Sequence, residues 1–181
     1  FGILINQTNG KLWATHIPLE LTINSEGKAI LEGHISKENV QCNGFLEKNE
    51  ILAVFSGPHS YISSSWYDHE NVPTWNYIAV HVYGKLKIIE GQAVIDSLKK
   101  LVDKYEQKYE NPTRIEDLSE KTMLQARGIV AFEIEIEEIQ ATRKMSQNRD
   151  AKNYKNIITE LEKENTFDSL ATANEMKKCP I

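Results

Sequence analysis

Apolar and polar residues alternate in short runs along the first half of the chain, and turn residues separate the runs. Leu19, Leu21 and Ile23 alternate with Glu20 and Thr22, which is the two-residue period of a strand with one solvated face. Asn9-Gly10 and Ser25-Glu26-Gly27 are typical hairpin turns. The pattern predicts strands over residues 1–5, 12–23, 29–35, 51–55, 75–83 and 85–89.

Proline residues interrupt this pattern at two places. Pro18 lies within 12–23 and indicates an edge position or a bulge, because proline has no N–H to donate. Ser56-Gly57-Pro58 predicts the end of the strand over 51–55. Residues 36–49 are polar around Phe45 and Leu46 and predict a short helix. Short strands joined by hairpins favour an antiparallel barrel over a parallel sheet.

The second half of the chain is largely helical. Residues 92–108 place apolar side chains at helical spacing, and Asn111-Pro112 ends that helix. Residues 116–125 predict a second, shorter helix. Residues 128–139 return to strand alternation, with Ile134 and Ile136 opposite three glutamates. Asp150 is suited to cap a helix that runs through Leu161, and 167–178 predict a last helix. The fold class is therefore α+β, mainly β.

Composition and charge restrict the class of protein. The chain has 181 residues, enough for one domain with a small helical appendage, and a net charge of −5. Lysines over 99–108 alternate with acidic residues, so the charge disfavours direct DNA binding. No apolar run approaches a membrane span. Cys42 and Cys179 form no disulfide framework, which fits the cytoplasm. The chain opens on Phe1 inside a predicted strand, so we expect further residues upstream.

Four histidines occur in the strand-rich half: His16, His34, His59 and His81. Imidazoles of this kind serve as metal or haem ligands, contact other cofactors, or make hydrogen bonds at a barrel rim. Their spacing matches no HxH or HExxH motif, and no cysteine accompanies them. The spacing favours hydrogen bonding, and we predict no metal site.

The segment from Ser56 to Tyr83 is rich in hydroxyl and aromatic side chains. Ser63–Ser65 lack a legible base or strained turn, so they suit a donor set better than a nucleophile. Trp66, Tyr67, Trp75 and Tyr77 suit either core packing or contact with a flat heteroaromatic ligand, and Asn76 adds an amide. Lys37 follows a predicted strand and is either a phosphate ligand or a surface lysine.

Five segments together resemble one family. ATHIPL, EGHISKEN, SGPHSYISSSWY, VPTWNYIAVHVYG and KMSQNR occur in the same order as in the PaiB-type proteins, negative regulators of protease synthesis and sporulation with an FMN-binding domain. The resemblance implies a split β-barrel like that of pyridoxamine-phosphate oxidases, FMN as cofactor, and a homodimer with the flavin between subunits. It also implies a helix before Phe1. Domains would be 1–149, with helices inserted over 92–126, and a helical extension over 150–181.

The resemblance also implies the residues of the flavin site. Ser36 and Lys37 would lie near the phosphate, Arg149 would be a second phosphate ligand, and aromatic and amide contacts would come from 63–67 and 75–77. This chain departs from the family at Ser64, where proline is frequent, and at Asn39–Cys42, where the family has NPQW. The implied site consists of His16, Ile17, Pro18, His34, Ser36, Lys37, Ser63, Ser65, Trp66, Tyr67, Trp75, Asn76, Tyr77, Gln147 and Arg149.

Three functions are compatible with this site. The first is a regulatory flavin-binding protein that acts through a partner or an operator, although no helix-turn-helix pattern is present. The second is a flavin-dependent oxidoreductase, in which the protein orients a cofactor that carries the chemistry. The third is a haem-binding or haem-degrading relative, because split barrels also serve haem proteins.

Overall fold

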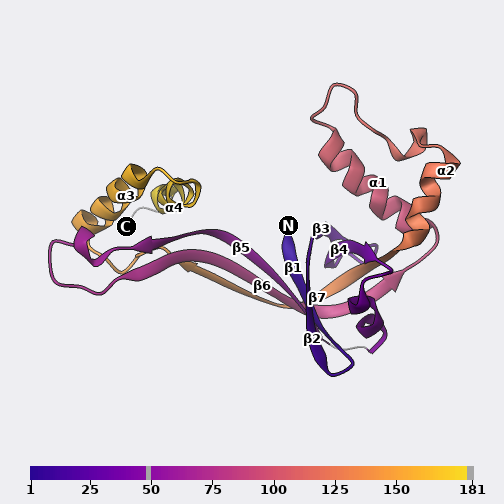
Figure 1. Ribbon diagram of the computed structural model, residues 1–181, viewed down its shortest axis with the longest axis horizontal. Helices are drawn as coiled ribbons and strands as arrows, with labels where there is room; N and C mark the ends of the chain where they lie inside the picture. The colour runs from indigo at the N-terminus through magenta and orange to yellow at the C-terminus, as the bar shows by residue number, and fades with distance from the viewer. Residues whose placement is uncertain (48–49, 179–181) are drawn as a thin grey trace. The chain divides into compact units, whose positions relative to one another are not determined.

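The computed structural model describes residues 1–47 and 50–178 and is built on one antiparallel sheet (Figure 1). Its seven strands follow the order β2-β1-β5-β6-β7-β4-β3. The strands are β1 (Gly2–Thr8), β2 (Lys11–Ile17), β3 (Glu20–Ile23), β4 (Ala29–Ser36), β5 (Glu50–Ile62), β6 (Thr74–Ile89) and β7 (Ile129–Lys144).

The strand order requires a barrel. β2 and β3 are consecutive in the chain, with only Pro18 and Leu19 between them, yet they lie at opposite ends of the order. Two residues span about 7 Å at most, whereas the two end strands of a flat seven-stranded sheet would lie about 30 Å apart. The sheet therefore curls until its ends meet. The single strand predicted over 12–23 is therefore wrong: Pro18 lies in no strand, and with Leu19 it links the two end strands β2 and β3.

The chain divides into two compact units, each described here separately. The barrel unit contains Phe1–Val54 and Val82–Ile139, and the helical unit contains Phe55–His81 and Gln140–Ile181. Strands β5, β6 and β7 each contribute residues to both units. The predicted boundary between residues 149 and 150 instead divides the chain in sequence, between the last strand and the C-terminal helices. It stays a prediction.

The barrel unit forms from local turns and a conventional apolar core. Asn9 (φ 52°) and Gly10 (φ 73°) make the left-handed turn that pairs Thr8 with Lys11, so the predicted hairpin is confirmed. In the 24–28 turn, Asn24 Oδ1 accepts hydrogen bonds from the backbone N–H groups of Glu26 and Lys28. Leu4, Ile30, Ile51, Phe132 and Ile134 are among its fully buried residues.

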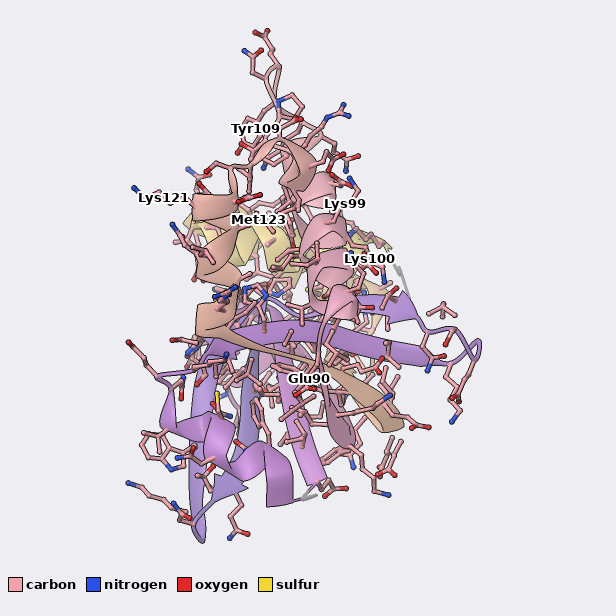
Figure 2. The ribbon with its side chains drawn as sticks, turned by 90° about the vertical axis from the view of Figure 1, so that its right-hand side faces the viewer. Glu90, Lys99, Lys100, Tyr109, Lys121 and Met123 are labelled. Carbon is pink, nitrogen blue, oxygen red and sulfur yellow. The ribbon has the colours of Figure 1, made fainter. Side chains whose placement is uncertain are left out.

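A helical insertion joins β6 to β7 within the barrel unit. Helix α1 (Gln92–Glu106) confirms the predicted helix, but the single helix predicted over 116–125 is wrong. Leu118 is extended, and the Ser119 side chain accepts a hydrogen bond from Thr122 N, which starts a new helix inside the predicted span. Figure 2 shows α1, which carries Lys99 and Lys100, beside α2, which carries Lys121 and Met123. The short helices are η3 (Ile115–Asp117), α2 (Glu120–Met123) and η4 (Leu124–Gly128).

The helical unit has its own core. Helices α3 (Ala151–Glu164) and α4 (Phe167–Lys178) lie side by side (Figure 1), and the short helix η2 (Ser64–Trp66) lies nearby in the same unit. Asp150 caps α3 by accepting from Asn153 N at 3.0 Å, as predicted. The buried core consists of Ile62, Tyr67, Met145, Tyr154, Ile157, Leu161, Ala173 and Met176.

The predicted break at Ser56-Gly57-Pro58 does not occur, because β5 continues through all three residues. A proline φ fits an extended strand, and only its missing N–H is a cost. Gly57 fits because a Cβ there would lie 2.9 Å from the Cβ of Ile78 on β6. The helix predicted over 36–49 is the 3-10 helix η1 (Val40–Glu47), and residues 48–49 lie outside the described residues, as does Cys179. None of the described helices is long and apolar enough to cross a membrane.

Candidate functional site

The predicted cofactor residues divide between the two units. His16, Ile17, Pro18, His34, Ser36 and Lys37 belong to the barrel unit. The others belong to the helical unit: Ser63, Ser65, Trp66, Tyr67, Trp75, Asn76, Tyr77, Gln147 and Arg149.

An open groove in the barrel unit brings the first set together. It lies where β2 and β4 end and β7 begins, and we call it the barrel groove. Five of the six predicted barrel residues line it, although they come from two separate sequence segments. The barrel groove is lined by Thr15, His16, Ile17, Pro18, His34, Ile35, Ser36, Asn39, Gln125, Gly128 and Ile129.

The turn after β4 holds Ser36 and Lys37 by their backbone. Ser36 Oγ accepts a hydrogen bond from Glu38 N at 3.2 Å, and Lys37 N donates to Gly128 O at 2.9 Å. A hydroxyl that accepts one bond can still donate its proton, so Ser36 can act as a donor toward the barrel groove. Lys37 instead lines a neighbouring hollow with Glu90 and Gly91. The two predicted phosphate ligands thus line different, adjoining hollows.

A buried polar network that was not predicted from the sequence supports the barrel groove. Fully buried Gln41 accepts from the Thr15 hydroxyl at 2.5 Å and donates to Leu4 O at 3.0 Å. Asn39 Nδ2 donates to Thr15 Oγ1 at 3.0 Å. This network ties η1 to the β1–β2 hairpin and fixes the groove wall. Asn39 and Gln41 are the two residues of the NPQW pattern that this chain keeps, which was the available signal.

Of the two histidines that line the barrel groove, His16 is exposed and His34 is half-buried. The His16 ring stacks on Phe1, with centroids 6.4 Å apart and planes at 21°. Burial lowers the pKa of His34, because a charged imidazole is penalised when it is removed from water. His34 is therefore neutral at neutral pH and has one donor and one acceptor nitrogen. His59 and His81 lie in the helical unit, and no cluster of three or more metal-ligating side chains occurs among the described residues.

In the helical unit, the turn after β5 presents hydroxyl groups. Ser65 N donates to Ser63 Oγ at 3.2 Å, and the two serine hydroxyls lie 2.8 Å apart. Trp66 is half-buried against the core, while Trp75 on β6 is 53% exposed, with Tyr61 at its edge 6.0 Å away. Core packing is thus confirmed for Trp66, whereas ligand contact by the exposed Trp75 stays a prediction.

Tyr67 is the most unusual of these aromatic residues. The residue is only 8% exposed, and the Arg149 guanidinium lies over its ring at 5.0 Å from the centroid. Its buried hydroxyl has no hydrogen-bond partner among the described residues, although a buried hydroxyl normally has one.

Asn76 and Gln147 use their amides within the protein. Asn76 is fully buried, accepts from Ser146 Oγ at 3.0 Å and donates to the Met176 sulfur at 3.5 Å, so it is not placed to contact a ligand directly. Gln147 accepts from Met145 N at 2.6 Å and donates to Arg143 O at 2.5 Å. Arg149 lines an open hollow of the helical unit together with Arg143 and Lys144. The positive charge of these three side chains suits an anion.

The family described as "Putative FMN-binding domain" matches residues 1–138. This span contains most of the chain. The chain belongs to this FMN-binding domain family. A relative from Bacillus subtilis (strain 168), named "Protease synthase and sporulation protein PAI 2", is 42% identical over 165 residues, which are 91% of this chain and 79% of the relative. The predicted PaiB-type resemblance is therefore confirmed.

Solved structures agree with the FMN-binding domain family in fold. A FAD and haem binding protein from Mycobacterium smegmatis aligns with a TM-score of 0.60 at 15% identity, covering 84% of this chain and 69% of that protein. Flavocytochrome Anf3 from Azotobacter vinelandii aligns with a TM-score of 0.55 at 16% identity, covering 85% and 66%. At these identities the likeness shows the fold alone. The predicted split barrel with C-terminal helices is confirmed.

Proposed function

We propose that this chain binds FMN in the barrel groove, that a second copy of the chain completes the site, and that the flavin serves a regulatory role of the PaiB type. One observation carries the proposal. His16, Pro18, His34 and Ser36 were predicted as flavin contacts from two sequence segments, and the fold lines one groove with all of them.

The donor set of the barrel groove fits a flavin nucleotide. Ser36 offers a hydroxyl proton to a phosphate oxygen, and Lys37, which lines the adjoining hollow, adds positive charge nearby. Neutral His34 offers a donor and an acceptor to the polar edge of a flat ring. Ile17 and Pro18 give that ring an apolar wall. Bound FMN would supply hydride and electron transfer.

The helical unit offers a separate set of groups to a ligand. Arg149 lines an open hollow there with Arg143 and Lys144, and its planar guanidinium suits an anionic group. Exposed Trp75, Tyr61 and Val72 give this unit an apolar surface of the kind that a second subunit covers. The homodimer rests on this surface and on the openness of the barrel groove.

Titration of the purified protein with FMN, followed by quenching of flavin fluorescence, tests the proposal. We expect Ser36→Ala to weaken FMN affinity roughly tenfold, because it removes a hydrogen bond to a charged group. Ser25→Ala, in the exposed β3–β4 turn, is the matched control and should bind like the parent. Failure of FMN to bind at all would overturn the proposal, as would equal affinities of the two variants.

Tyr67→Phe tests whether Tyr67, a predicted site residue, contacts FMN. The substitution removes only a hydroxyl that has no partner in the described structure, so stability should not fall. A loss of FMN affinity of roughly threefold or more would place this hydroxyl on the ligand. Unchanged affinity would remove Tyr67 from the site and leave the barrel groove as its carrier. Sedimentation with and without FMN measures the proposed dimer.

The regulatory role has two competitors that can be separated experimentally. A flavin-dependent oxidoreductase would reduce bound FMN with NADH or NADPH, and absence of reduction by either would exclude that reading. Two histidines in one groove also favour haem as an alternative, which a Soret band would reveal. The acidic net charge of −5 favours regulation through a partner over an operator. Promoter DNA retardation that collapses with modest salt would indicate only non-specific binding.

A further inference from the structure

A second hollow lies beside the barrel groove, between α1 and the β3–β4 hairpin. We call it the α1 pocket, and its lining includes Pro18, Leu21, Ser97, Lys100, Leu101 and Lys104. Pro18 and His34 line both this pocket and the barrel groove. A molecule in the α1 pocket would therefore meet a flavin in the groove at these two residues.

The wall of the α1 pocket combines an apolar surface with a row of polar groups. Pro18, Leu21 and Leu101 provide the apolar part. Ser97, Lys100 and Lys104 are three or four residues apart on α1, so their side chains lie on one face of the helix. Figure 2 shows Lys100 on this helix, with Lys99 one residue before it.

Of the charged groups at the α1 pocket, the lysines are more accessible to a ligand than the glutamates. Glu32 accepts from Lys100 at 2.9 Å, and Glu20 accepts from Lys104 and from Tyr105. The two carboxylate side chains are only 13% and 20% exposed, whereas those of Lys100 and Lys104 are 59% and 56% exposed. An ammonium group has three donors, and one bond to a glutamate leaves further donors for an anion.

We infer that the α1 pocket binds a small organic anion, whose carboxylate or phosphate is held by Lys100 and Lys104 and whose apolar body lies on Pro18, Leu21 and Leu101. The inference rests on the proposed function only for the neighbouring flavin. It names the class of molecule that would reach the flavin: a planar or compact apolar compound with one anionic group.

The test uses 2-naphthoate as the probe and calorimetry on the full chain, both flavin-free and loaded with FMN. We expect Lys100→Gln and Lys104→Gln each to weaken binding roughly tenfold, because each removes a charge-assisted hydrogen bond. Lys99→Gln is the matched control. Lys99 lies on the same helix and is paired with Glu116, but it lines a different hollow. It should bind the probe like the parent.

Two further measurements keep the inference falsifiable. Leu101→Phe should abolish binding by filling the pocket without a change of charge, and neutral 2-naphthamide should bind without any dependence on the two lysines. In the loaded protein, 2-naphthoate should also shift the flavin absorption bands. Equal effects of Lys99→Gln and Lys100→Gln, or no binding at millimolar probe, would overturn the inference and leave the ion pairs as a purely structural link.

Failure here is distinguishable from failure of the proposed function. Lysine-dependent binding to the flavin-free chain, with no FMN affinity, would keep the α1 pocket and reject the flavin site. FMN binding without any naphthoate binding would do the reverse.

Discussion

The two units use an amphipathic helix in different ways. α1 in the barrel unit and α3 in the helical unit both repeat apolar residues at helical spacing. Tyr154, Ile157 and Leu161 of α3 are buried, whereas α1, which lies wholly within the described part of the chain, contains no buried residue. α1 is connected to the β3–β4 hairpin by ion pairs. Helical spacing identifies an apolar face, but the neighbouring surface decides whether it is buried.

Truncation of one leucine in each helix measures this difference most directly. Leu161 is fully buried in the helical core, so Leu161→Ala should lower the free energy of unfolding by about 2–5 kcal/mol. Leu98 of α1 is only half-buried, and Leu98→Ala should cost about 1 kcal/mol or less. Urea unfolding of both variants gives the comparison. Equal losses would mean that α1 is buried by something outside the described contacts.

The barrel unit should be most sensitive where its strands approach closely. A Cβ at Gly84 on β6 would overlap the backbone carbonyl oxygen of Glu135 on β7, so Gly84→Ala should cost about 1–3 kcal/mol. Gly128 has open space around its Cα, and Gly128→Ala should stay within about 0.5 kcal/mol. Thermal unfolding checks both. A tolerated Gly84→Ala would show that β6 and β7 can shift apart.

The smallest expected effect is a loss of stability at low pH, which depends on a different carboxylate in each unit. Hydrogen bonds from Lys152, His69 and Asn153 hold the pKa of Asp68 in the helical unit far below its usual value of 3.8. A carboxyl with a lowered pKa stabilises the fold above its ordinary pKa, and this stabilisation is lost as the pH falls toward the lowered value. Acidification below about pH 4 should therefore loosen the helical unit.

Asp68→Asn should flatten this acid dependence in α3, as measured by amide hydrogen exchange. In the barrel unit, the hydrogen bond from Lys28 lowers the pKa of Glu135, so Glu135→Gln should flatten it in β4 instead. Both carboxylates are exposed, so the changes should be modest. If either variant altered both units equally, the division into two units would be wrong.

Local chemistry was predictable from the sequence because it depends on a few adjacent residues. The Asn9-Gly10 turn and the Asp150 cap formed as expected, since backbone conformation and one side chain decide them. The predicted strand end at Ser56-Gly57-Pro58 was wrong for a non-local reason. A strand paired with its neighbours along its length can contain a proline, and Gly57 packs against Ile78 of β6.

The candidate site was predictable as residue types but not as geometry. Residue spacing encodes neither the burial of Asn76 nor the place of Lys37 at a hollow other than that of Ser36. Gln41 supports the groove through hydrogen bonds to Leu4 and Thr15, which are distant from it in the chain. These contacts depend on how β1 and β2 pair, so the local sequence around Gln41 does not reveal them.

Motif identity and short-range periodicity were sufficient to predict the family, the turns and most strands of this protein. Which motifs meet was set by the tertiary structure. It curled the sheet through the two-residue link at Pro18 and Leu19, brought His16 and His34 into one groove, and left Tyr67 with an unpartnered hydroxyl in a different unit. Long-range strand pairing sets these placements, and no local pattern records which strands pair.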